Sequence, residues 1–286
     1  MQSMVSRRVF LGTLAAAGAG LSTSRVFAQG GGLLEQLRKA GVARLGFAQQ
    51  PPFSELLPDG SVGGLAPTVT KLILEKLGIP KVTGIIAPYG QLIPGLQAGR
   101  WDMIGACLNI TKARCAQVRY SDPIVFDGAA FGYLRADAPT PPKSIAEWGR
   151  SGTKVGVLAG GYLVAPAQAV AGAPANVVQF PDNPALIDGL LARRVNVALA
   201  AYSAMRDLKA SRKDAFEIVY PLEGDNPTGS APAFRSTDTD LFDAYQRELR
   251  ALRKSGEFFK ISERFGFDMP ANRREQTNQQ ACDSAA

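Results

Sequence analysis

One arginine stands out because of the residues that precede it. Residues 101–108 are apolar apart from Asp102 and lead into Asn109, Ile110 and Thr111, and Arg114 follows three residues later. This pattern predicts a buried strand, a loop, and a short helix from whose beginning Arg114 projects. A guanidinium is always charged, and its planar fork of donors matches a carboxylate with two parallel hydrogen bonds. We therefore expect Arg114 to hold an anionic group; the ordinary alternative is a surface ion pair.

Histidine is absent from the chain. Its absence excludes Ser-His-Asp and Cys-His catalysis, together with every metal site that uses imidazole. We expect neither a metal nor a cofactor.

The first 28 residues are expected to be an export signal and not part of the fold. Residues 6–11 carry a twin-arginine pattern, a weakly apolar segment follows, and Val-Phe-Ala at 26–28 suits a signal peptidase. The apolar run is shorter than the roughly 20 residues of a membrane span. The mature chain is therefore expected to begin near Gln29, in the periplasm. Its formal charge falls from +7 to +4 because three arginines are removed, and without a polybasic run nucleic acid is not an expected partner.

Three cysteines in an exported protein allow one disulfide and one free thiol. Cys107 lies in the apolar run, where a small core residue is expected. Cys115 and Cys282 are the better candidates for a bridge, which would fasten the C-terminal tail beside Arg114. The spacing alone leaves the pairing open.

Two stretches share one order of elements. Residues 41–133 and 143–222 each read as strand, turn, helix, strand, helix, strand, and the chain then returns to the first unit. This predicts an α/β fold of two lobes joined by two crossing strands, with loops at the strand ends facing a cleft. The expected parts are lobe 1 at 29–133, lobe 2 at 134–230, and the return with the tail at 231–286.

The C-terminal part is expected to contain two helices. Residues 238–240 are expected to cap a helix that runs to Lys254, and a second helix ends at Arg264. The polar tail after Phe267 is expected to be loosely held.

Two loops are expected at the cleft. Gln50 and Phe53 follow the first strand of lobe 1, and Gly160, Gly161 and Tyr162 follow the first strand of lobe 2. The second loop is either a plain turn or a helix N-terminus that presents backbone amides to an anion.

The chain resembles a known family in a series of segments that occur in order. They are Gly64-Leu65-Ala66-Pro67, residues 92–102 (LIPGLQAGRWD), residues 110–114, Tyr120-Ser121-Asp122-Pro123 and residues 249–266. These resemble the periplasmic solute-binding proteins (family 3) of polar amino-acid ABC transporters, which implies the two-lobed type II periplasmic binding protein fold. Within the family, residues 50–53, 87–90 and 113–115 look most like the ectoine- and hydroxyectoine-binding branch. That resemblance implies that Arg114 holds the ligand carboxylate and that Phe53 and Tyr89 form aromatic walls, which suit a delocalised cation.

Three positions depart from the family pattern. Amino-acid binders carry an aspartate for the α-ammonium where this chain has Ala201, which disfavours a plain α-amino acid. Ectoine binders carry an acid where this chain has Gln50 and an aromatic residue where it has Asn109. The ligand is therefore expected to be less cationic than ectoine, or to meet another acid such as Asp182 or Asp127.

We expect a binding protein and not an enzyme. A monomer would close on a small carboxylate-bearing solute and deliver it to an ABC permease. The alternative is an exported enzyme like cyclohexadienyl dehydratase, for which Glu55 is the nearest candidate acid. A sensor that acts through a partner receptor is a third possibility.

Overall fold

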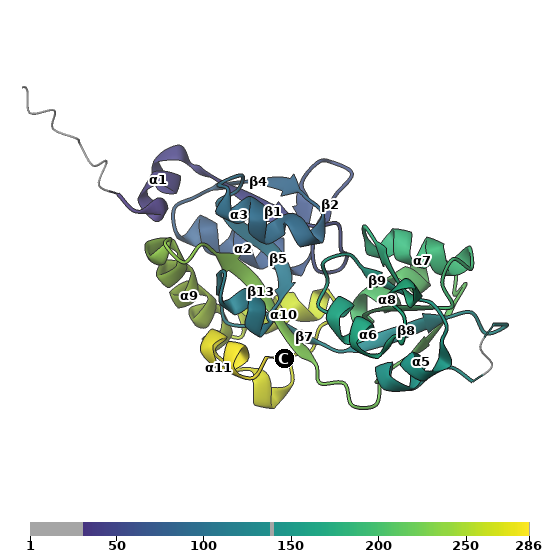
Figure 1. Cartoon of the computed structure of the whole chain (residues 1–286). Helices are drawn as coiled ribbons and strands as arrows, with labels where there is room; N and C mark the ends of the chain where they lie inside the picture. Colours follow the sequence, from purple (N-terminus) through teal and green to yellow (C-terminus); the bar gives the residue numbers. More distant parts are fainter. Residues whose placement is uncertain (1–30, 138–139, 286) are drawn as a thin grey trace, which may run out of the picture. The chain divides into compact units, whose positions relative to one another are not determined.

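The computed structural model describes residues 31–137 and 140–285, so the expected twin-arginine signal lies outside the described residues. These residues form two α/β lobes, each built on its own sheet (Figure 1). No helix in residues 31–137 and 140–285 is both long and apolar enough to cross a membrane.

The first lobe contains a sheet of order β4-β1-β5-β13-β6, with β7 paired to β13. β1 is parallel to β4 and β5, whereas β13 runs antiparallel to β5. β5 is a continuous apolar run because both faces of the sheet are covered by helices. The strands are β1 (Val42–Phe47), β4 (Lys81–Ile86), β5 (Met103–Asn109), β6 (Arg119–Tyr120), β7 (Val125–Asp127) and β13 (Thr228–Phe234). A small hairpin of β2 (Glu55–Leu56) and β3 (Val62–Gly63) lies outside this sheet.

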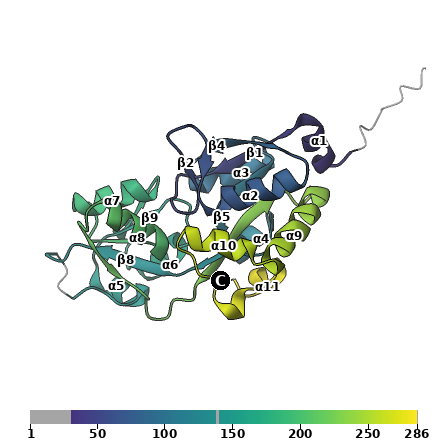
Figure 2. The same cartoon turned by 180° about the vertical axis from the view of Figure 1, so that it is seen from behind.

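Helices cover both faces of this first sheet. One apolar core joins it to α1 (Leu33–Ala40), α2 (Leu65–Lys76), α9 (Thr239–Lys254) and α10 (Glu257–Arg264). A second core, centred on the buried Trp101, joins the other face to η1 (Tyr89–Gln91) and α3 (Leu92–Gln97). The view from behind shows α9, α10 and the C-terminal helix α11 (Asn278–Asp283) on this lobe (Figure 2).

The second lobe contains a sheet of order β10-β9-β11-β8-β12. Its strands are β8 (Ala129–Tyr133), β9 (Val155–Leu158), β10 (Val177–Phe180), β11 (Val197–Ala201) and β12 (Glu217–Val219). One face packs on α5 (Ile145–Ser151) and α6 (Val164–Val170), and the other on α7 (Asn183–Leu191) and α8 (Tyr202–Ser211). A short η2 (Pro174–Asn176) precedes β10.

Two crossing segments join the lobes. The first runs from β7 through Gly128 to β8, and the second runs from β12 to β13. The two segments are linked where Ala129 N–H donates to the Asp225 carboxylate at 2.8 Å. The expected α/β fold of two lobes with two crossings is therefore present.

Two local expectations about helices were wrong or incomplete. Helix α5 was not expected, although Ser144 caps it by accepting from the N–H of Glu147. Asp238 stands at the N-terminus of α9 but makes no capping hydrogen bond, because its carboxylate pairs with Arg235 at 2.8 Å.

The C-terminal tail is docked, not loosely held. It contains η3 (Ala271–Arg273) and α11 (Asn278–Asp283). Asn278 N–H donates to the buried carboxylate of Asp122, and Cys282 forms a disulfide with Cys115. The polar composition of the tail did not indicate this docking, because a hydrogen bond to Asp122 and the Cys115–Cys282 bridge fasten it; the expected bridge was its one sign in the sequence.

Candidate functional site

A cavity of about 40 Å³ lies between the two lobes, and we call it the central cavity. Most of the residues that line it lie in or just after the carboxyl ends of β1, β5, β9, β10 and β11, where ligands bind in open α/β sheets, while Asp127 ends β7 and Ser230 lies near the start of β13. First-lobe and crossing residues of the lining include Gln50, Phe53, Cys107, Asn109, Asp127 and Ser230; second-lobe residues include Gly161, Tyr162, Asn183 and Ala201.

Five of the seven expected ligand-binding residues line the central cavity: Gln50, Phe53, Asn109, Gly161 and Tyr162. Phe53 is held by the ring of Phe267, with centroids 5.3 Å apart. The N–H of Gly161 donates to the carbonyl of Leu158, so the loop is a plain turn at that amide.

Tyr89 and Arg114 do not line the central cavity. Tyr89 lies in an adjoining hollow of about 220 Å³ that shares Gln50 with the cavity. Arg114 lines a second hollow, of about 710 Å³, whose wall shares Gly161 and Tyr162 with the central cavity. Both residues therefore lie beside the cavity, and they touch each other, since Arg114 Nη1 donates to the Tyr89 hydroxyl at 3.4 Å.

Asn109 connects Tyr89 and Arg114 to the central cavity. Its side-chain oxygen accepts from the Tyr89 hydroxyl at 2.6 Å, and its side-chain nitrogen donates to Ser230 at 3.0 Å. Its backbone carbonyl accepts from Arg114 Nη1 and from Tyr120, each at 3.0 Å. Asn109 thus positions the arginine and the tyrosine, a role that depends on tertiary contacts and left no signal in the sequence.

The other terminal nitrogen of Arg114 reaches the second lobe. Nη2 donates to the carbonyl of Gly160 at 2.7 Å. Burial lowers the pKa of Arg114, but the hydroxyls of Tyr89 and Tyr120 raise it by more, so the guanidinium stays charged. Arginine has five N–H donors, two of them on Nη2, so a ligand carboxylate can bind Arg114 beside the Gly160 carbonyl or in its place.

The loops of the two lobes touch beside Arg114. Gly160 has φ of +69°, and a Cβ atom there would lie 2.6 Å from the Cα of Gly90. Such a distance is too short for any side chain, so the contact requires glycine on the second-lobe loop.

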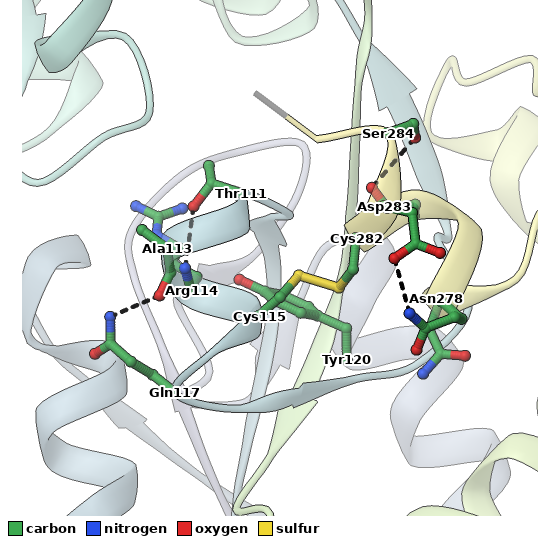
Figure 3. The surroundings of a disulfide bond; sticks show 12 residues. Thr111, Ala113, Arg114, Cys115, Gln117, Tyr120, Asn278, Cys282, Asp283 and Ser284 are labelled. Carbon is green, nitrogen blue, oxygen red and sulfur yellow. Dashed lines mark hydrogen bonds between the residues drawn. A yellow bond between two sulfur atoms is a disulfide. The ribbon is translucent and has the colours of Figure 1, made fainter.

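A short helix, α4 (Lys112–Cys115), carries Arg114. Thr111 caps it by accepting from the N–H of Arg114, and the next residue, Cys115, is bonded to Cys282 of α11 (Figure 3). The pair expected from the sequence is therefore the bridged pair, and Cys107 is a buried free thiol. Burial raises the pKa of Cys107 further above its usual range, so it is a poor nucleophile.

Two buried polar residues in the cavity wall were absent from the expected binding set. The sequence offers Asp127 only as a replacement acid, and Asn183 carries no signal beyond its place after Asp182, the N-cap of α7. Asp127 accepts from the N–H and hydroxyl of Ser203, and burial nevertheless raises its pKa from 3.8 to about 6. Asp182, the other acid considered, caps α7 through the N–H of Ala185 and lines the hollow of Tyr89, not the central cavity.

Comparisons with known proteins agree with this architecture. Residues 43–268 match the family of bacterial extracellular solute-binding proteins, family 3. A probable amino-acid ABC transporter periplasmic-binding protein (y4tE) of Sinorhizobium fredii is 29% identical over 242 residues, which are 82% of this chain and 80% of that protein. The L-arginine-binding protein of Pseudomonas aeruginosa is 26% identical over 229 residues, 78% of this chain and 86% of that protein.

The structure of EhuB in complex with hydroxyectoine superimposes with a TM-score of 0.83 and 35% identity, covering 88% of this chain and 98% of EhuB. The fold is the type II periplasmic binding protein fold, as the sequence resemblance implied. The protein belongs to the bacterial extracellular solute-binding proteins, family 3, and is a solute-binding protein of the amino-acid ABC transporter type.

Proposed function

We propose that this protein captures a small solute with a carboxylate, of the ectoine and hydroxyectoine class or a related amino-acid derivative, and delivers it to an ABC permease from the periplasm. The observation that carries the proposal is the central cavity at the strand ends of both lobes, with Phe53 and Tyr162 in its wall and Arg114 beside it. Similarity to EhuB, whose structure holds hydroxyectoine, supports this ligand class.

Arg114 is the proposed partner of the ligand carboxylate. It is charged, fixed by Asn109 and Tyr89, and shares the walls Gly161 and Tyr162 with the cavity. A ligand carboxylate would bind both terminal nitrogens, and closure of the lobes would then shift in favour of the bound form.

A plain α-amino acid is a less suitable ligand. Ala201 lines the cavity at the position where the amino-acid-binding proteins that this chain resembles carry an aspartate. An α-ammonium would lose that partner, and buried charges without a partner are unfavourable.

The enzymatic alternative loses its expected acid. Glu55 belongs to β2 and is not among the residues that line the central cavity. Assay of the purified protein with prephenate checks this alternative: dehydration that disappears in Glu55→Gln would refute the binding function.

Calorimetry with ectoine, hydroxyectoine, glycine betaine and L-arginine tests the proposal. Arg114→Ala should lower the affinity for any carboxylate ligand by roughly 10- to 100-fold, since a charge-assisted pair contributes about 1.5–3 kcal/mol. Arg247→Ala, an exposed arginine of α9, is the matched control and should bind like the parent protein. Equal affinity of Arg114→Ala and the parent would contradict the proposed role of Arg114.

A further inference from the structure

Two nearly buried polar residues, Asn183 and Asp127, line the central cavity. Asn183 is 3% exposed, and its side-chain oxygen has no hydrogen-bond partner within residues 31–137 and 140–285. Asp127 is 9% exposed, and both hydrogen bonds from Ser203 end on Oδ2. Buried polar atoms in native proteins nearly always have partners, so the unpartnered oxygen of Asn183 indicates a donor supplied by a ligand.

A purely structural role for Asp127 is to cap α8, since Ser203 lies in the first turn of that helix. An anion at a helix N-terminus is normally stabilised in its charged form. Here burial opposes the charge more strongly than the hydrogen bonds from Ser203 and from the backbone N–H of Gly128 favour it, since the net effect is a pKa raised to about 6. The hydrogen bonds of the cap therefore offset only part of the cost of burying the charge of Asp127.

The titratable groups around Asp127 do not neutralise its charge. Cys107 and Tyr162 have pKa values raised mainly by burial, as has Tyr220, and the charge of Asp127 raises all three further. The guanidinium of Arg206 lowers the pKa of Asp127, but it pairs with the neighbouring Asp207 at 2.7 Å and also donates to the carbonyl of Gly266.

We infer that Asp127 and Asn183 bind the positively charged, N–H-bearing end of the ligand, such as the amidinium of a small ring. This inference rests on the proposed function, in which Arg114 holds the carboxylate at the other end. Phe53 and Tyr162 line the same cavity, and aromatic faces suit a delocalised cation. The ligand is then a zwitterion, and the cation partner that Ala201 and Gln50 do not supply comes from the crossing segment and from α7.

Two probes that differ in one charge test the inference. Ectoine has a six-membered ring with a carboxylate and an amidinium, whereas 6-oxopiperidine-2-carboxylate has a similar ring, the same anion and a neutral amide. Calorimetry measures both with the parent protein, Asp127→Asn, Asn183→Leu and Asp182→Asn. The parent should bind ectoine more tightly than the neutral probe. Asp127→Asn should lower the affinity for ectoine by roughly 10- to 100-fold and change the affinity for the neutral probe little.

Asn183→Leu should also weaken ectoine, because it removes the oxygen that accepts from the ring N–H, while Asp182→Asn should bind both probes like the parent. Ectoine affinity of the parent should fall as pH drops below about 6. Asp225 also has a raised pKa and lies near Tyr162, so it could add to the pH dependence of ectoine affinity. The part of this pH dependence that is lost in Asp127→Asn is the part due to Asp127.

The outcomes separate the two proposals. If ectoine binds through Arg114 but equally well in Asp127→Asn, the inference is wrong and the proposed function stands. The inference also fails if the parent prefers the neutral ring, or if Asp182→Asn is the variant that loses the preference. Binding of neither probe refutes the proposed ligand class and the inference together.

Discussion

Asp127→Asn should stabilise the ligand-free protein near pH 7.5. The folded state raises the pKa of this carboxyl from 3.8 to about 6, so it holds the proton more tightly than the unfolded chain does. Stability therefore falls as pH rises from about 4 to about 6, and the whole cost is present above that range. Asparagine does not ionise and still offers an oxygen to Ser203, so it avoids the cost.

The magnitude follows from the shift. A difference of about two pH units, at about 1.4 kcal/mol each, gives about 3 kcal/mol as the upper limit for the gain above pH 6. The amide accepts weaker hydrogen bonds than a carboxylate, so we expect a gain of about 1–3 kcal/mol.

Urea unfolding of the parent and Asp127→Asn at pH 4, 5, 6, 7 and 8 measures this gain. The difference between the two proteins should be small at pH 4 and reach its plateau above pH 6. Other carboxylates that titrate in both proteins cancel in the difference. If Asp127→Asn is less stable than the parent by a similar amount at every pH, Asp127 is a capping residue and the reasoning about its charge is refuted.

Two further substitutions address the lobe contact and the tail. Gly160→Ala should weaken ligand binding at least several-fold without unfolding the second lobe. The reason is that φ of +69° and the Cα of Gly90 leave no room for a Cβ atom when the two loops meet. Unchanged affinity in calorimetry would argue against this contact in the bound form. Asp122→Asn should destabilise the protein by about 2–4 kcal/mol at pH 7 in urea unfolding. Burial raises the pKa of Asp122, but Arg250 and the N–H of Asn278 are among the donors that lower it by more, so this stability is present above pH 4 and lost on acidification. A variant that matches the parent at pH 7 would contradict the anchoring role.

The sequence predicted those parts of the site that follow from strand ends. Gln50 and Asn109 come directly after apolar runs, so their place at the carboxyl edge of a sheet follows from the order of elements. The partners of Arg114 did not follow, because the carbonyl of Gly160 reaches it only through the packing of two lobes. The lining role of Asn183 was missed for a similar reason: one helix position decides which residue faces the cavity, and a pattern of apolar residues does not fix that rotation.

If Arg114 and Asp127 have the proposed roles, the central cavity and the hollow beside it suit a zwitterion. Each is held by a protein group that a ligand can replace or supplement: the carbonyl of Gly160 for the arginine, and the donors of Ser203 for the aspartate. A ligand carboxylate would offer Arg114 a charged acceptor in place of, or beside, the neutral carbonyl, and charge-assisted hydrogen bonds are the stronger ones. A ligand cation offsets the burial of the Asp127 charge, which the ligand-free protein bears as a cost to stability. On this proposal, a solute that carries one charge alone obtains one of the two gains and should be bound more weakly than a zwitterion.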